Sequence, residues 1–299
     1  MPGSRVAFLG LGAIGRPMAA RVGLRYPLTV WNRSPERARD FAARVPAARL
    51  AASAADAVRD TDVVMTCLST SADVESLLAD PSGVAAALRP GTLFLDCTSG
   101  DPATSRRLAA QLSPRGVAFA DCPVSGGTNG AEAGALTVMV GADPAVFERA
   151  RPFLETFGRL IVHVGSVGAG DTIKAVNQVL LASNILSLGE ALTAMVKAGV
   201  DARRGMEVLN ASSGRSFVSE TLVPDRVLTG AWPNTFRLAL LHKDVGIALD
   251  LVERLRLEAP VLAQVRSVLG RARAALGEEA DYLEVIRLNE ARAGVEVRG

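Results

Sequence analysis

Short β-rich runs alternate with amphipathic helical stretches through the first 165 residues of this 299-residue chain, and this alternation limits the fold more than any other feature. Strands separated by helices are typical of βαβ units and of a mainly parallel, doubly wound sheet. A helix is expected from Ala13 to about Arg25. A second helix is expected from Ser34, its N-cap, to about Arg44. We expect a mixed edge at 135–141. The runs expected to be strands are RVAFLG (5–10), LTVWN (28–32), DVVMTCL (62–68), TLFLDC (92–97), VAFADCPV (117–124) and ALTVMVG (135–141).

The pattern changes after residue 165, where long helical stretches replace the β-rich runs. A run from Ala169 to about Ala198 is longer than an average globular helix and predicts a long helix that leads from an interdomain cleft into a helical domain. We therefore predict an α/β domain over residues 1–165 and an all-helical domain over residues 166–299. Breaks in the helical part are expected at Gly199, Ser212–Gly214, Pro224, Pro233 and Pro260.

Composition favours small-molecule partners. The net charge of +2 arises from 33 basic and 31 acidic residues without a basic stripe, which is not typical of a nucleic-acid binder. Glycines interrupt the apolar start, and no uninterrupted apolar run approaches the roughly 20 residues of a membrane span. We expect a soluble cytoplasmic protein without a membrane partner.

The cysteines and histidines do not predict a metal site. Cys67, Cys97 and Cys122 show no CxxC spacing and lie in or beside apolar runs, which favours buried, reduced thiols over a disulfide or metal role. His163 and His242 are too isolated to build a zinc site.

The segment GLGAIG (10–15) matches G-x-G-x-x-G directly after an expected strand and before an expected helix. In this context the glycines allow a tight turn and close approach of the backbone, and the helix N-terminus offers N–H groups to a pyrophosphate. A purely structural turn is the alternative. The sequence favours a Rossmann-type dinucleotide site formed by Gly10, Leu11, Gly12, Ala13, Ile14 and Gly15.

The end of the second expected strand indicates which dinucleotide is preferred. NAD-specific sites usually carry Asp or Glu there, whereas this chain has Asn32, Arg33 and Ser34, with Arg37 one helical turn on. A guanidinium and hydroxyl donors suit a 2′-phosphate, which a carboxylate would repel. NADP(H) is therefore expected, with NAD as the alternative. The alternative, less favoured, is that Arg33 is only a solvated surface charge.

A Gly-rich segment follows the strand expected at 117–124. Ser125, Gly126 and Gly127 stand at a strand end, where open α/β sheets bind ligands, and could offer N–H and hydroxyl donors to a carboxylate. A merely structural Gly-rich loop stays open.

Lys174 is one of only three lysines in a chain that otherwise uses arginine. On a helix it shares a face with Asn177 and Gln178, with Asn184 further along. Burial and a neighbouring cation can bring the pKa of a lysine towards neutrality, so Lys can exchange a proton near pH 7 where Arg cannot. An acid/base role for Lys174 is thus indicated, although the composition alone leaves it open. The residues expected on the opposite, apolar side are Ile173, Val176, Val179, Leu180 and Leu186.

Lys243 lies in LLHKDVGIALD (240–250), beside Asp244. It is either a cleft residue that reaches the nicotinamide or the substrate carboxylate, or part of a solvated helix turn with a salt bridge.

Together these segments resemble the β-hydroxyacid dehydrogenase family, most closely its 3-hydroxyisobutyrate dehydrogenases, over nearly the whole chain. The segments occur in the same order as in the family. The set of segments is highly specific for the family, although no single segment is. The matching segments are GLGAIGRPMA (10–19), DCPVSGGTNGAEAGALTVMVG (121–141), GAGDTIKAVNQ (168–178) and KDVGIALD (243–250).

The resemblance implies reversible NAD(P)-dependent oxidation of a short 3-hydroxy acid to its semialdehyde, as in valine catabolism, by a homodimer or homotetramer joined through its helical domains. Lys174 matches the catalytic lysine, and Asn177 matches the amide that orients substrate and lysine. Ser125, Gly126 and Gly127 match the substrate-carboxylate loop. The residues that fall where relatives contact the cofactor are Leu68, Ser69, Asp73, Ser99 and Lys243.

Some positions depart from the family pattern and keep alternatives open. Either Thr98 or Ser99 could meet the nicotinamide ribose, and Gln178 stands where many relatives have Asn. A reductase of glyoxylate, succinic semialdehyde or tartronate semialdehyde would use the same residues, whereas imine reductases usually lack the lysine. A non-catalytic NADP-binding scaffold is disfavoured because Lys174 and Asn177 are both present.

Overall fold

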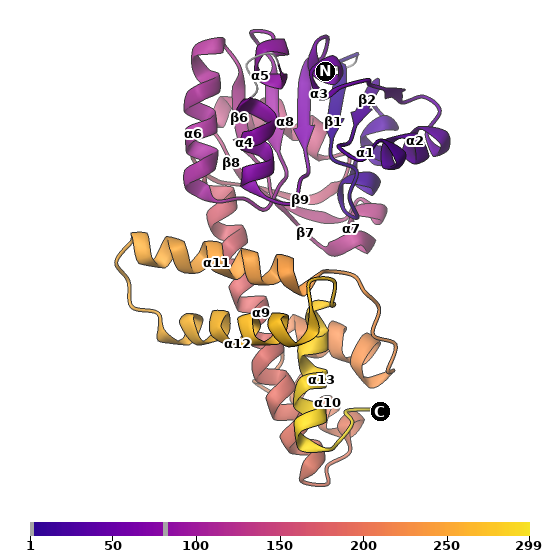
Figure 1. Ribbon diagram of the computed structural model, residues 1–299, viewed down its shortest axis with the longest axis vertical. Coiled ribbons are helices and arrows are strands. Elements are labelled where there is room, and N and C mark those ends of the chain that lie inside the picture. The colour runs from indigo at the N-terminus through magenta and orange to yellow at the C-terminus, as the bar shows by residue number, and fades with distance from the viewer. Residues whose placement is uncertain (1–2, 80–82) are drawn as a thin grey trace. The chain divides into compact units, whose positions relative to one another are not determined.

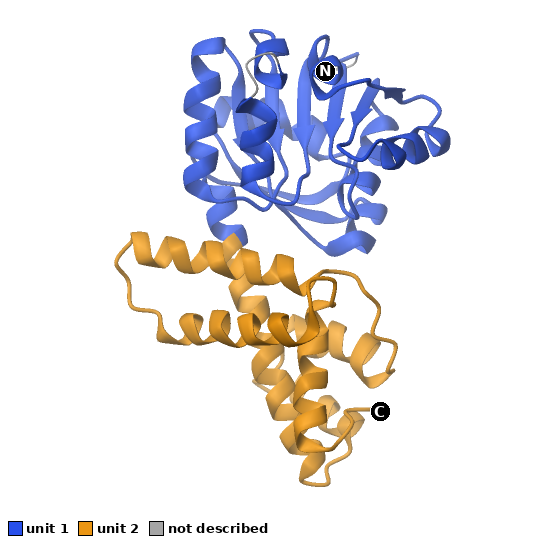
Figure 2. Ribbon diagram, viewed as in Figure 1, with its two compact units in different colours: residues 1–174 blue, residues 175–299 orange. Residues whose placement is uncertain are grey.

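The computed structural model describes residues 3–79 and 83–299. The chain divides into two compact units, residues 1–174 (unit 1) and 175–299 (unit 2), each with its own secondary structure (Figure 2). The division falls within a single long helix, so the domain boundary expected at residue 165 stays a prediction.

Unit 1 alternates strands and helices along the chain (Figure 1). Its strands are β1 (Val6–Leu9), β2 (Leu28–Trp31), β3 (Arg49–Leu50), β4 (Val63–Thr66), β5 (Leu93–Asp96), β6 (Ala118–Asp121), β7 (Val124–Ser125), β8 (Leu136–Gly141) and β9 (Gly158–Gly165). Its helices are α1 (Gly15–Gly23), α2 (Pro35–Arg44), α3 (Ala54–Val58), α4 (Ser71–Ala79), α5 (Val84–Ala87), α6 (Pro102–Leu112), the short 3₁₀ helix η1 (Ser113–Arg115), α7 (Gly127–Ala133) and α8 (Pro144–Leu154).

The described strands form one sheet in the order β3-β2-β1-β4-β5-β6-β8-β7, with β9 paired to β8. The first six strands are parallel and follow the order of a doubly wound dinucleotide-binding sheet. Strand β8 is antiparallel to β6 and β7 and parallel to β9, which confirms the mixed edge. The run 117–124 forms two strands rather than one, because Pro123 lacks the N–H that a continuous ladder requires.

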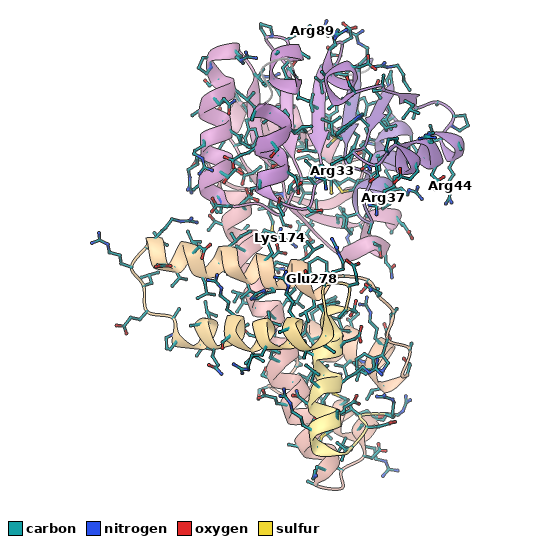
Figure 3. The ribbon with its side chains drawn as sticks, viewed as in Figure 1. Arg33, Arg37, Arg44, Arg89, Lys174 and Glu278 are labelled. Atoms are coloured by element: carbon teal, nitrogen blue, oxygen red, sulfur yellow. The ribbon has the colours of Figure 1, made fainter. Side chains whose placement is uncertain are left out.

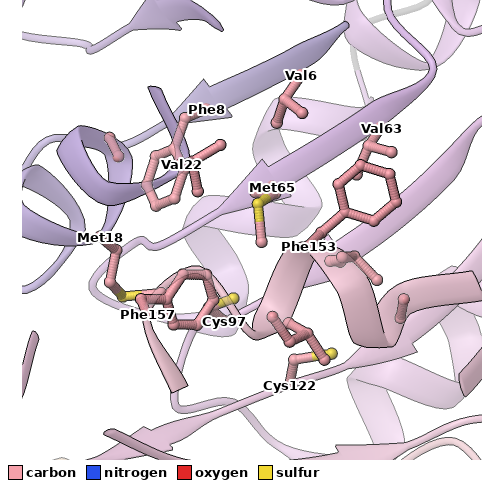
Figure 4. Close-up of a cluster of buried hydrophobic side chains, with 14 of the residues drawn as sticks. Val6, Phe8, Met18, Val22, Val63, Met65, Cys97, Cys122, Phe153 and Phe157 are labelled. Carbon is pink, nitrogen blue, oxygen red and sulfur yellow. The ribbon is translucent and has the colours of Figure 1, made fainter. Parts of the chain in front are cut away.

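The central strands β1, β4 and β5 of the sheet in unit 1 are buried on both faces. Along β1, Val6 and Phe8 enter one apolar cluster (Figure 4), while Ala7 and Leu9 enter the cluster on the other face. A strand that is apolar at every position is typical of a parallel sheet covered by helices on both sides. The alternation of strands and helices therefore predicted this architecture correctly.

The three cysteines belong to this interior rather than to a reactive site. All are free thiols, and burial raises the pKa of Cys67 to about 12 and the pKa values of Cys97 and Cys122 above the usual range. A thiol that stays protonated behaves as a small apolar side chain.

Unit 2 is helical, and its interior is a separate apolar cluster that includes Val179, Ile185, Leu241 and Leu269. Pro224 does not end a helix as expected, because it lies inside a π-helical stretch, whose hydrogen-bond pattern differs from that of an α-helix. The elements that follow the long helix α9 (Ala169–Lys197) are α10 (Ala202–Asn210), the π-helix η2 (Val218–Leu228), α11 (Leu238–Arg254), α12 (Pro260–Leu276), the 3₁₀ helix η3 (Tyr282–Glu284) and α13 (Val285–Ala293).

Helix α9 has the expected length. Lys174 and Gln178 are buried, in helical register with Ala182 and Ile185. Of the residues expected on the opposite, apolar side, Val179 and Leu186 are buried, whereas Ile173, Val176 and Leu180 are exposed. By length and a mean hydropathy of 1.6, α9 is the one helix of the described residues that is long and apolar enough to cross a membrane. Of that apolar window, 39% is buried. The residues of α9 that enter the interior of unit 2 are Ala175, Val179, Ala182, Ile185, Leu186 and Leu192.

Candidate active site

The glycine loop of unit 1 has the geometry of a phosphate-binding turn. Gly10 has a φ of 103°, and a side chain there would collide with the carbonyl oxygen of Cys67. A side chain at Gly15 would collide with the carbonyl oxygen of Gly10, so this glycine lets α1 begin close against the loop. A Cβ at Gly12, in contrast, would meet no atom within 4 Å. Gly10 and Gly15 thus serve the turn, and Gly12 faces the open space that a pyrophosphate needs.

Asn32 ties the end of β2 to this loop. Its Oδ1 accepts a hydrogen bond from the Leu11 N–H at 2.8 Å, and its Nδ2 donates to the Ser34 carbonyl oxygen at 3.0 Å. The residue that replaces the acidic group of NAD-specific sites therefore holds the backbone of the loop. Ser34 occupies the N-cap position of α2, although its side chain makes no capping hydrogen bond.

Arg33, the expected ligand of a 2′-phosphate, is labelled in Figure 3 and forms an ion pair with Asp73 of α4. Its Nη1 lies 3.0 Å from Asp73 Oδ1, and the arginine side chain is 82% exposed. Thr70 holds the same carboxylate through a hydrogen bond from its hydroxyl to Oδ2. Arg37 is also exposed, on the first turns of α2. The structure thus brings Arg33 and Asp73, two expected cofactor residues, into direct contact.

The carboxyl ends of β4 and β5 carry the remaining expected cofactor residues of unit 1. The Leu68 N–H donates to Thr98 Oγ1 at 3.0 Å, and Thr98 is buried. Ser99 is half-buried and Ser69 is exposed. Because Thr98 is enclosed and holds the backbone, its position favours Ser99 as the hydroxyl that reaches a ligand.

The Ser125–Gly127 segment links β7 to α7. Gly126 and Gly127 have φ values of 133° and 65°, a conformation that residues with a side chain rarely adopt. Both glycines are exposed, and a Cβ on Gly127 would meet no atom within 4 Å. The segment thus presents backbone N–H groups at the first turn of α7, as the carboxylate-binding role requires.

Buried carboxylates attach the first turn of α9 to the sheet of unit 1. At the end of β6, Asp121 accepts hydrogen bonds from the N–H groups of Gly168 at 2.7 Å and Asp171 at 2.9 Å. The carboxylate of Asp171 accepts from the Gly100 N–H at 3.0 Å and from Ser105 Oγ at 2.6 Å. The N–H groups at a helix start have no partner within the helix, so these acceptors determine where α9 begins.

The charged forms of the same two carboxylates are disfavoured by burial and by neighbouring carboxylates. Burial raises the pKa of Asp121 to about 6, with a further increase from Asp96, although hydrogen bonds from backbone N–H groups oppose the shift. Burial raises the pKa of Asp171 well above its usual value, and the nearby charges of Asp121 and Asp96 add to the increase. The sequence did not single out Asp121 or Asp171; their positions at a strand end and in a first helical turn are signals, but only the fold shows that they meet.

Lys174 lies one turn beyond Asp171 on α9 and is only 7% exposed (Figure 3). Because Asp121 and Asp171 anchor that first turn at the carboxyl edge of the sheet, Lys174 follows directly from the edge that carries the glycine loop. A buried ammonium or amine on an anchored helix has a restricted position, which suits proton transfer to a bound group.

In unit 2, four polar side chains form a chain of contacts. Asn177 Nδ2 donates to Gln178 Oε1 at 3.2 Å, and Gln178 Nε2 donates to Asp244 Oδ2 at 2.8 Å. Lys243 Nζ lies 2.9 Å from Asp244 Oδ1. The salt bridge of Lys243 therefore exists, but it is not the solvated pair considered from the sequence, because the Asp244 side chain is only 4% exposed.

Family comparisons agree with this arrangement. A family model described as the NAD binding domain of 6-phosphogluconate dehydrogenase matches residues 5–165. A second, described as the NAD-binding region of NADP-dependent 3-hydroxyisobutyrate dehydrogenase, matches residues 168–289.

Individual relatives cover most of the chain. It is 37% identical to 2-(hydroxymethyl)glutarate dehydrogenase of Eubacterium barkeri, over 99% of this chain and 98% of that protein. It is 38% identical to NAD-dependent L-serine dehydrogenase of Pseudomonas aeruginosa, over 83% of this chain and 85% of that protein. The structure of Mycobacterium tuberculosis 3-hydroxyisobutyrate dehydrogenase with L-serine is similar with a TM-score of 0.87 and 32% identity, over 96% of this chain and 99% of that one. The chain therefore belongs to the β-hydroxyacid dehydrogenase family and is an NAD(P)-dependent 3-hydroxyacid dehydrogenase of the 3-hydroxyisobutyrate dehydrogenase type.

Proposed function

We propose that this enzyme interconverts 2-substituted 3-hydroxypropanoates, of the form HOCH₂–CHR–COO⁻, and their semialdehydes, with NADP(H) preferred and Lys174 as the general acid/base. 2-(Hydroxymethyl)glutarate, L-serine and 3-hydroxyisobutyrate, which occur in the names of its relatives, all have this form. Each carries a primary alcohol on the carbon next to the one that bears the carboxylate. A site that recognises both groups would accept the class and use R to select among its members.

The position of Lys174 carries this proposal. Its helix is attached to the sheet by Asp121 and Asp171, so the buried amine belongs to a rigid element rather than to a loop. In oxidation the neutral amine takes the proton of the substrate hydroxyl, and in reduction its ammonium form returns that proton. A bound nicotinamide supplies the acceptor or donor of the hydride.

The other residues of the site orient the substrate. The N–H groups of Gly126 and Gly127, together with the Ser125 hydroxyl, hold the carboxylate, which fixes the distance from the carboxylate to the reacting carbon. Asn177, one turn after Lys174, keeps the amine and the hydroxyl aligned. Contact of Lys243 with cofactor or substrate remains part of the proposal.

The proposed preference for NADP(H) rests on the end of β2. Position 32 carries Asn rather than a carboxylate, and the exposed Arg33 side chain, paired with Asp73, supplies a guanidinium next to it. The cofactor cradle fits a dinucleotide, since the turn requires glycine at Gly10 and Gly15 and leaves open space at Gly12.

Substitution of Lys174 tests the acid/base assignment. Lys174→Ala should lower kcat by about 10²- to 10⁴-fold, the usual contribution of a positioned acid or base, and leave the NADPH dissociation constant nearly unchanged. Lys197→Ala is the matched control, because Lys197 is an exposed lysine of the same helix. Turnover of Lys174→Ala within threefold of wild type would exclude this mechanism.

A substrate panel tests the chemical class. Oxidation of 3-hydroxyisobutyrate, L-serine and 2-(hydroxymethyl)glutarate should be measured with NADP and with NAD, alongside reduction of glyoxylate, succinic semialdehyde and tartronate semialdehyde. We expect the highest kcat/KM for a 2-substituted 3-hydroxypropanoate with NADP. A clear preference for glyoxylate or succinic semialdehyde would replace the proposed class with that of a different aldehyde reductase.

A further inference from the structure

The polar chain Asn177–Gln178–Asp244–Lys243 lies mostly in the interior of unit 2. Gln178 and Asp244 are 4% and 3% exposed, and 66 residues separate them along the chain. Burying an amide and a carboxylate costs free energy unless both are hydrogen-bonded, so their 2.8 Å contact is required for the packing of α9 against α11. The packing requirement does not explain why Asn177 is part of the chain, because Asn177 is only half-buried.

The Asp244 carboxylate determines which side chain donates and which accepts at each hydrogen bond of this polar network. An ionised Asp244, paired with the Lys243 ammonium, can only accept hydrogen bonds, so Gln178 must present its Nε2 to it. Gln178 Oε1 is thereby directed the other way and accepts from Asn177 Nδ2. The amide of Asn177 is then oriented with its nitrogen towards Gln178 and its Oδ1 as the acceptor on the other side.

We propose that Gln178 and Asp244 are positioning residues that determine the orientation of the Asn177 amide for proton transfer at Lys174. This inference rests on the proposed function, because it assigns to Asn177 the alignment of the amine and the substrate hydroxyl. An Asn177 amide in the reverse orientation would present two N–H donors where the ammonium of Lys174 or a hydroxyl requires an acceptor. The interaction would then be repulsive rather than attractive.

Gln178 also has the length that this role requires. Its additional methylene, relative to an asparagine, lets the amide bridge Asn177 on its own helix and Asp244 on α11. The departure from the family pattern at this position therefore has a structural consequence in this chain: it couples the catalytic helix to the Lys243–Asp244 pair.

A double-mutant cycle tests the proposal. Gln178→Met keeps the size of the side chain but removes both hydrogen-bonding groups, and it should lower kcat by about 10- to 100-fold, as misplacement of a catalytic group does. In an Asn177→Ala background the same substitution should lower kcat by less than about twofold, because the residue through which Gln178 acts is already absent. The NADPH dissociation constant should change little in either background.

A second variant keeps the test valid if Gln178→Met does not fold. In Asp244→Asn the new amide can present either an oxygen or a nitrogen to Gln178. The donor and acceptor order of the hydrogen bonds is then no longer fixed, while the shape of the side chain is retained. Its effect on kcat should likewise disappear in the Asn177→Ala background. Asp250→Asn is the matched control on α11, since Asp250 is exposed and pairs with Arg266 outside this chain.

The outcomes separate this inference from the proposed function. Equal losses from Gln178→Met and Asp244→Asn in both backgrounds, in proteins with native circular dichroism, would show a purely structural role and overturn the proposal. The Lys174→Ala variant is measured in parallel. If Lys174→Ala is inactive and the cycle is additive, only the positioning role fails; if Lys174→Ala is active, the proposed mechanism itself fails.

Discussion

At the scale of single residues, the pair Arg33–Asp73 bears on the choice of cofactor. The guanidinium that would receive a 2′-phosphate already has a carboxylate at 3.0 Å, and both groups face solvent to some extent. Exposed ion pairs contribute about 0.2–1 kcal/mol, so a phosphate dianion can replace Asp73 at small cost. Asp73 is therefore expected to weaken, but not to prevent, recognition of NADP(H).

Substitutions at the two positions should change the cofactor preference in opposite directions. Arg33→Ala should lower the ratio of kcat/KM for NADP to kcat/KM for NAD by about 10- to 100-fold, since it removes a charge-assisted contact. Asp73→Asn should raise the ratio by roughly two- to fivefold, because it removes the competing carboxylate. Arg44→Ala, an exposed arginine at the end of α2, serves as the control (Figure 3). An unchanged ratio in Arg33→Ala would assign the preference to other residues.

At the scale of elements, the attachment of α9 to the sheet combines hydrogen bonding with electrostatic strain. Asp121 and Asp171 satisfy N–H groups of the helix start and the neighbouring loop, yet both carboxylates are buried and have raised pKa values. An acid whose folded pKa exceeds its unfolded pKa stabilises the fold fully below the unfolded value. That contribution is lost as the pH rises through the folded pKa.

The stability of unit 1 should consequently fall as the pH rises from about 5 to 7, through the pKa of about 6 of Asp121. Asp171→Asn imitates the protonated state, and the Ser105 hydroxyl can reverse to accept from the new amide. We expect this variant to increase the free energy of unfolding at pH 7.5 by about 1–3 kcal/mol and to flatten its pH dependence. Urea unfolding at pH 5 and 7.5 measures both effects, with the exposed Asp40→Asn as control. A wild-type pH slope in Asp171→Asn would contradict the account.

At the scale of the whole molecule, the two units have separate apolar interiors. Each unit contains one of the two tryptophans of the sequence. Trp31 ends β2 beside the cofactor loop. The guanidinium carbons of Arg287 and Arg298 lie 5.6 and 5.5 Å from the centroid of the Trp232 ring. Fluorescence can therefore follow each unit by itself, and multidomain chains commonly unfold in more than one transition.

Leu269 is fully buried in unit 2, so Leu269→Ala should destabilise that unit by about 2–5 kcal/mol. We expect the denaturant midpoint reported by Trp232, in a Trp31→Phe background, to fall. The midpoint reported by Trp31, in a Trp232→Phe background, should change less and should rise with NADPH. Equal shifts of both midpoints would indicate one cooperative unit instead of two.

Much of the fold was predictable because its signals are local. Fully apolar strand runs such as VAFL in β1 require cover on both faces, and their alternation with helices predicts a parallel sheet. The glycine spacing predicted the turn, and the run from Ala169 predicted α9 almost to its last residue. The break expected at Pro224 was wrong, since a proline is compatible with a π-helical stretch that no local pattern announces.

The sequence by itself determined the mainly parallel sheet, the long helix and the glycine turn, because each depends on residues near one another in the chain. It also indicated Lys174 as the candidate acid/base, a role that stays a prediction. Only the tertiary structure decided the partners of the polar side chains. Asp171 meets Ser105, and Gln178 meets Asp244, in each case 66 residues apart, and Arg33 meets Asp73 across 40 residues. Such partners depend on which elements the packing brings together. For the two buried pairs, burial then makes the hydrogen bonds obligatory.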